Sequence, residues 1–143
     1  MGHTLNYRAM WLIFFLLLRA QEAAGAASSP TLDYQYYKAK IEPLFLEKRP
    51  GHARCVVCHS TSTAFRLQPL PPGANAWTEA QSQKNFEAAR RFVVPGKAQN
   101  SRLLLMPLSH DAGGTEFHPG GKHWESQSDP EWKLLEEWVK GAK

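Results

Sequence analysis

Apolar residues recur at three- and four-residue steps in several parts of the chain, a spacing that puts them on one face of a helix. The first such part is residues 34–48. Its apolar face consists of Tyr34, Tyr37, Ile41, Leu44 and Phe45. Pro43 lies inside this stretch and is expected to kink or shorten the helix, because proline lacks a backbone N–H and crowds the preceding turn.

A second helix is predicted to begin at Thr78, which forms a T-x-x-Q capping box with Gln81. Its buried face is expected to contain Phe86, Ala89 and either Phe92 or Val93. The short apolar segment 101–108 predicts a helical turn that Ser101 caps and Pro107 stops.

The last part of the chain has the clearest helical pattern. Asp129 is the predicted N-cap, Pro130 falls in the first turn, and Gly141 ends the helix. Its apolar face contains Trp132, Leu135, Trp138 and Val139. No segment alternates convincingly as a strand, so we predict an all-α fold. The long loops leave a thin core, which a flat apolar cofactor would fill.

The first 26 residues differ from the rest. An unbroken apolar run, residues 11–18, follows Arg8, and small residues with an Ala24-Gly25-Ala26 cleavage signal come next. This order predicts a secretory signal peptide (1–26), since the run is shorter than the ~20 residues that span a bilayer. An uncleaved anchor is the alternative. A short tail (27–33) and one domain (34–143) follow, and we expect the protein to be exported to the periplasm.

Charge is a weak guide to function here. The chain has 17 basic and 13 acidic residues, and the predicted mature part keeps 15 and 12. No basic run with interleaved aromatic residues indicates nucleic acid binding. Lys48, Arg49, His52 and Arg54 form a basic cluster, which we interpret as a solvated loop or as a docking patch for an acidic partner.

Both cysteines lie in the stretch "CVVCH", Cys55 to His59. A disulfide between them would close a very small loop and stabilise little. A thioredoxin-like dithiol needs a preceding strand, which the pattern does not predict. A zinc site could use His118 and His123, but the interval after Cys58 is far longer than in a zinc finger, and His59 would have no role.

The pattern C-x-x-C-H is typical of covalent attachment of c-type haem. Cys55 and Cys58 would form thioether bonds to the two vinyl groups, and His59 would bind the iron on the proximal side. The two valines between the cysteines suit a helical turn packed on apolar surface. Export agrees with this chemistry, because this type of haem is attached outside the cytoplasm.

The chain also resembles a known family. "YYKAKIEPLFLEKRPGHARCVVCHS" and "PGKAQNSRLLLMPL", with "LLEEWVKGA" near the end, are similar to segments of small bacterial class I-like monohaem cytochromes c. The resemblance covers most of residues 34–142. It implies a cytochrome c-like fold of three to five helices around one haem, and electron transfer. The "RPGHA" insertion and the proline-rich loop at 69–72 depart from the shortest members.

The resemblance also bears on the distal iron ligand. The family's Met-Pro position falls on His118-Pro119 when the last helices are matched, so we expect bis-histidine ligation by His59 and His118. Met106, which Pro107 follows, is the alternative ligand. His123, His110 or an open position are further alternatives, and an open position would permit small-ligand binding.

We therefore expect an electron carrier rather than an enzyme, with protein redox partners in the periplasm or at the membrane. The alternatives from other classes are a haem-based sensor or peroxidase-like module with an open distal site, and a zinc-stapled interaction module. Among the aromatic residues, Trp77 or Trp124 could donate an indole N–H to a haem propionate.

Overall fold

The computed structural model describes residues 30–61 and 63–143, so the predicted signal peptide and the first three residues of the tail lie outside the described residues. The described part is helical, and its one β-type pairing is an isolated bridge between Leu108 and Trp124. The all-α prediction is confirmed. The elements are α2 (Tyr34–Tyr36), η2 (Tyr37–Ile41), α3 (Glu42–Leu46), α4 (Cys55–His59), α5 (Glu79–Arg90), η3 (Ala98–Asn100), α6 (Arg102–Leu105), η4 (His110–Ala112) and α7 (Pro130–Val139).

The first three elements form one continuous helical stretch. Asp33 caps it, since its Oδ1 accepts the Tyr36 N–H at 2.6 Å. The helix continues through Pro43, and the predicted kink takes the form of a π-helical segment, η2, in which the Glu42 N–H donates to Tyr37 O. Because proline cannot donate the usual backbone bond, the wider turn relieves the crowding before it. Tyr37, Ile41, Leu44 and Phe45 are buried, as predicted.

Helices α5 and α7 begin where the sequence predicts. The Thr78–Gln81 capping box is present in both directions. Asp129 accepts from the Glu131 N–H at 2.9 Å, and Pro130 occupies the first turn of α7. Trp132, Leu135, Trp138 and Val139 are fully buried. Gly141 ends this helix with φ +94°, a conformation that favours glycine.

Helix α6 corrects one detail of the sequence prediction. Ser101 occupies its N-cap position, but the hydroxyl makes no capping bond. It accepts the Val94 N–H and donates to Lys97 O, both at 2.9 Å. The fully buried Ser101 therefore ties the preceding turn together instead of capping α6.

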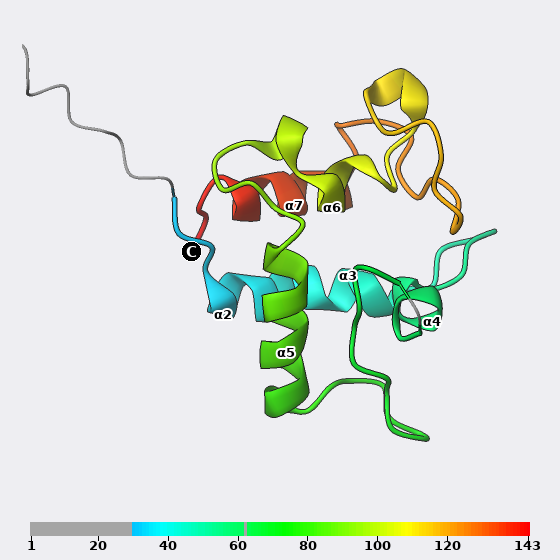
Figure 1. Cartoon of the computed structure of the whole chain (residues 1–143), viewed down its shortest axis with the longest axis vertical. Coiled ribbons are helices and arrows are strands. Elements are labelled where there is room, and N and C mark those ends of the chain that lie inside the picture. Colours follow the sequence, from blue (N-terminus) through cyan, green and yellow to red (C-terminus); the bar gives the residue numbers. More distant parts are fainter. Residues whose placement is uncertain (1–29, 62) are drawn as a thin grey trace, which may run out of the picture.

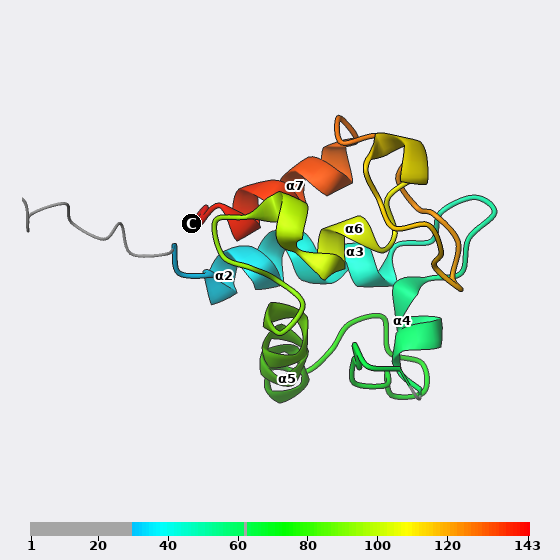
Figure 2. The same cartoon turned by 45° about the horizontal axis from the view of Figure 1, so that its top comes forward.

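The helices pack around the α2–η2–α3 stretch (Figure 1). Helix α7 lies alongside the α2–η2–α3 stretch, and α5 crosses that stretch from another side. Figure 2 shows that α4 and the loop after α6 lie at one end of the described part, and that α2 and the C-terminus lie at the opposite end, the terminal end. At the terminal end, Trp138 Nε1 donates to Asp33 O at 2.9 Å and joins the first and last helices. None of the helices in the described part is long and apolar enough to cross a membrane.

Candidate functional site

A cavity of about 340 Å³ opens at the end of the molecule that carries α4. A volume in this range is typical of small-molecule and cofactor sites. Its walls are mainly apolar side chains from α3, α6 and the loops around them, namely Leu44, Phe45, Phe65, Phe92, Leu103 and Trp124. The site residues predicted from the sequence, Cys55, Cys58, His59, His118 and Met106, all line it.

The two cysteines lie on the short helix α4, and neither forms a disulfide. Cys55 is partly buried and Cys58 is exposed. Burial raises the pKa of Cys55, which is unlike the lowered pKa of a reactive redox thiol. The valines between them were predicted to pack on apolar surface, and this is half correct: Val56 is buried, but Val57 is 52% exposed.

His59 is held by the segment that follows it. Its Nδ1 lies 2.8 Å from Phe65 O and 3.3 Å from Thr63 Oγ1. The Leu67 N–H donates to His59 O at 2.7 Å and closes the segment. Because a carbonyl oxygen only accepts, Nδ1 must carry the proton, and Nε2 is left with a lone pair. Burial lowers the pKa of His59, which favours this neutral form.

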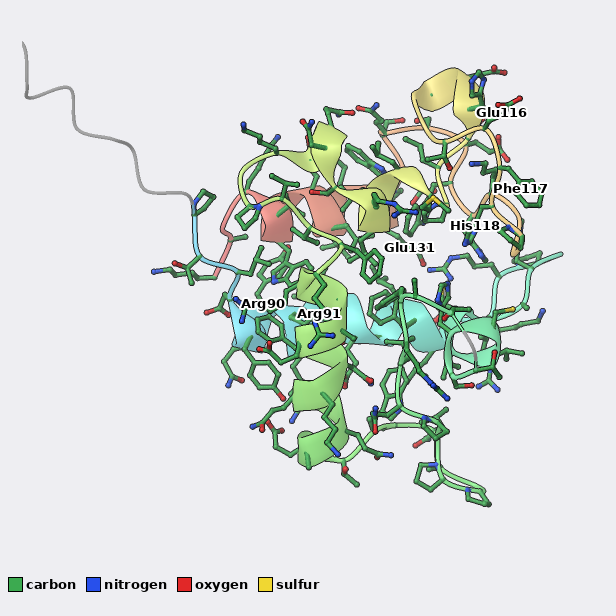
Figure 3. All side chains as sticks on the ribbon, viewed as in Figure 1. Arg90, Arg91, Glu116, Phe117, His118 and Glu131 are labelled. Carbon is green, nitrogen blue, oxygen red and sulfur yellow. The ribbon has the colours of Figure 1, made fainter. Side chains whose placement is uncertain are left out.

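His118 is fixed in the same way on the opposite loop. Its Nδ1 lies 2.6 Å from Gly121 O, and its own carbonyl accepts the Gly121 N–H at 2.9 Å. Gly121 has φ +82°, a conformation that allows this tight turn. By the same argument, Nδ1 of His118 carries the proton, and Nε2 is the ring nitrogen able to bind a metal. Figure 3 shows His118 on the loop near α4, and the neighbouring Phe117 is 73% exposed.

The two imidazole rings form a pair across the site. Their centroids are 6.2 Å apart and their planes differ by 18°. A metal–imidazole bond is about 2.0–2.1 Å, and a ring centre lies about 1.2 Å beyond its nitrogen, so two histidines on opposite sides of one metal have centroids about 6.4–6.6 Å apart. The 6.2 Å centroid spacing of His59 and His118 is close to that of such a pair and slightly shorter.

The other candidate distal ligands are placed differently. Met106 also lines the cavity, and Thr115 Oγ1 lies 3.6 Å from its sulfur. His123 lines it too, with its ring 4.7 Å from that of His52, and burial is the largest of the effects that lower its pKa to about 4. His110 is exposed on η4 and lies outside the cavity lining.

The zinc alternative required Cys55, Cys58, His118 and His123 to converge. In residues 30–61 and 63–143, no group of three or more His, Cys, Asp or Glu side chains is arranged to hold a metal ion. A haem iron needs fewer protein ligands than a zinc ion, because the porphyrin supplies four nitrogens and the chain supplies only the axial ligands. The apolar walls, the two thiols and the paired imidazoles fit that group.

Two expectations about surrounding residues are corrected. Arg49 was placed in a solvated basic cluster, but its side chain is 11% exposed and its Nε and a terminal nitrogen bond Glu131 at 2.7 and 2.5 Å. Trp77 and Trp124 were considered as donors to a propionate. Their indole N–H groups instead bond Gln68 O at 2.8 Å and Glu131 at 2.9 Å.

The sequence analysis missed several residues of the site. Thr63 and Phe65 position His59, and Phe65, Phe92 and Leu103 form the walls. Arg54 and Arg102 contribute cations to the lining. The sequence predicts part of the cavity wall, since Phe92 is a candidate for a buried helix face and segment 101–108 is apolar. The acceptor of the His59 proton had none, because any backbone carbonyl can take that role.

Comparisons of the chain with protein-family models, with curated proteins and with solved structures find no match.

Proposed function

We propose that this protein is an exported monohaem c-type cytochrome that carries electrons between periplasmic or membrane redox partners. Cys55 and Cys58 would hold the haem covalently, His59 would be the proximal ligand and His118 the distal ligand. The observation that carries the proposal is the pair of imidazoles in one apolar cavity, 6.2 Å apart, with both Nδ1 atoms bonded to backbone carbonyls. A cytochrome c-like arrangement of the helices is part of the same proposal.

The chain's own residues would tune such a site. When bound, a c-type haem supplies an iron that accepts one electron from a donor and passes it to an acceptor. The Nδ1–H bonds of His59 and His118 orient both rings and make them better donors to a metal. The apolar walls exclude water and lower the local dielectric, which together with the axial ligands sets the reduction potential. Arg54 and Arg102 line the cavity and would offer positive charge to the propionates of such a group.

The test is to produce the full chain in a host that attaches c-type haem and to purify it from the exported fraction. We expect a coloured protein that is heavier than the polypeptide by one haem, with a low-spin spectrum typical of two nitrogen ligands. Cys55→Ala combined with Cys58→Ala should abolish covalent attachment. A colourless protein with the mass of the polypeptide alone would refute the proposal.

The distal ligand is tested by a matched pair of variants. His118→Ala should convert the low-spin spectrum to a high-spin one and open the iron to carbon monoxide, whereas Met106→Ala should leave the spectrum unchanged. The reverse result would assign Met106. Carbon monoxide binding to the unaltered protein would favour the sensor or peroxidase-like alternative.

A further inference from the structure

The loop that carries His118 is closed by a lysine. Lys122 lies four residues after His118, and its Nζ donates to Met106 O at 3.0 Å, to Thr115 Oγ1 at 3.2 Å and to Thr115 O. An ammonium group has three donors, and all three have a partner here. The side chain thus joins both ends of the segment 115–122 to each other and to the end of α6.

Backbone hydrogen bonds mark the same points as the ends of the loop. The Thr115 N–H donates to Leu105 O at 3.0 Å, and the His123 N–H donates to Pro107 O at 2.7 Å. Between these two bonds, the backbone of 116–121 takes part in the His118–Gly121 turn and in one bond from Thr115 Oγ1 to Phe117 O at 3.3 Å. The placement of His118 relative to α6 therefore depends on the two ends and on the lysine that connects them.

The bonding of Lys122 is unusual for a lysine. In the described residues no ion pair involves Lys122, and its acceptors are two carbonyls and a hydroxyl. The Met106 carbonyl is at the C-terminal end of α6, where helix carbonyls lack partners within the helix and favour a cation. Lys122 donates to this carbonyl and, with the same ammonium group, to Thr115 at the other end of the loop.

We propose that Lys122 is a positioning residue that holds the 115–122 loop closed and thereby sets the distance between His118 and His59. This inference rests on the proposed function for the role of His118, but the closure of the loop can be measured without it. The expected consequence is that loss of the three donors lets the loop open and His118 leave the iron more often.

The test compares Lys122→Met with Lys84→Met in the full, haem-loaded chain. Methionine keeps most of the apolar stem but has no donor, and Lys84 is an exposed lysine on α5 that serves as a matched control. In Lys122→Met we expect the amides of Thr115 and His123 to exchange about tenfold faster, the change that corresponds to about 1.4 kcal/mol. Carbon monoxide should also bind faster, because the distal position is open more often. Lys84→Met should change neither quantity.

The two readouts separate the possible failures. Unchanged amide exchange in Lys122→Met would refute closure of the loop by Lys122. Faster exchange with unchanged carbon monoxide binding would refute the link to His118. A native protein without haem would refute the proposed function, while amide exchange would still decide whether Lys122 closes the loop. If Lys122→Met does not fold, Thr115→Val removes one acceptor and should give a smaller change in the same direction.

Discussion

The terminal end and the cavity end of this molecule are built differently. At the terminal end, Tyr37, Phe86 and Trp138 pack together, with ring centroids 5.3 to 6.1 Å apart, and the first and last helices close over them. At the cavity end, aromatic and aliphatic side chains surround a space of about 340 Å³, and histidines line it beside the thiols. One end packs its own side chains against each other; the other leaves apolar walls facing a cavity.

This difference indicates where the protein's stability comes from. Close packing of buried apolar side chains is the main favourable contribution to folding. The terminal end has that packing, whereas the walls of the cavity lack contacts on one side. A ligand that binds only the folded chain and fills the cavity would add stability there by mass action.

The largest expected effect is that of Trp138→Ala. Trp138 is fully buried at the terminal end, so its removal should lower the free energy of unfolding by about 3–5 kcal/mol. Phe92→Ala is the comparison at the cavity end, where the ring is partly buried, and should cost less than half as much. Urea denaturation of both variants measures the two losses. Equal losses would show that the two ends are packed alike.

The next effect concerns the link between α3 and α7. Arg49 joins Leu44 O, at 3.2 Å, to Glu131 on α7, and Glu131 also accepts from Trp124 in the cavity wall. Arg49→Met leaves the carboxylate of Glu131 without its cation, which should cost about 1–3 kcal/mol, because the pair is only partly buried.

A double-mutant cycle with Glu131→Gln measures this coupling directly. The combined variant should lose less stability than the sum of the two single changes. Arg90→Met, which breaks an exposed pair with Glu87 on α5, should have an effect close to zero. A coupling no larger than that of the exposed pair would mean that Arg49 does not link α3 to α7.

A smaller effect should come from Gly114, which begins the approach to the His118 loop. A Cβ at this position would lie 2.0 Å from Leu108 O, so the backbone must shift. We expect Gly114→Ala to cost about 1–2 kcal/mol and to speed amide exchange mainly at the cavity end. Gly73→Ala is a useful comparison, because its Cβ would meet nothing and only the φ of +76° is unfavourable. Similar exchange in both variants would argue against close packing at Gly114.

The same contrast explains what could be predicted from the sequence. The helices at both ends carry local signals, such as the Thr78–Gln81 capping box and the face of Trp132 and Trp138, and these predictions were correct. The positions of Cys55, Cys58 and His59 follow from a five-residue motif. The Arg49–Glu131 pair depends on which distant segments meet. The partners of Ser101 and of the two indoles are nearby in sequence but depend on how irregular turns and loops fold. Spacing along the chain contains no information on that.

The smallest effect tests an ionisable group buried at the helix interface. Glu42 is 7% exposed, its Oε1 accepts from Ser82 Oγ at 2.9 Å, and its Oε2 has no hydrogen-bond partner. Burial raises the pKa of this carboxyl, while the Ser82 bond and Lys38 oppose the rise. The folded state therefore favours the protonated acid, and stability is lost as the pH increases from the ordinary glutamate range through the raised pKa.

Glu42→Gln removes the ionisation but keeps an acceptor for Ser82. We expect it to be more stable than the unaltered protein at pH 7, by about 1 kcal/mol, and to lose this advantage near pH 4. Urea denaturation across this pH range measures the difference. Glu87→Gln makes the same change in charge at an exposed position on α5 and should not reproduce the effect. If the stability of Glu42→Gln relative to the unaltered protein instead increases toward acid pH, the fold stabilises the charged form of Glu42. A cation would then have to lie closer to Glu42 than Lys38 does.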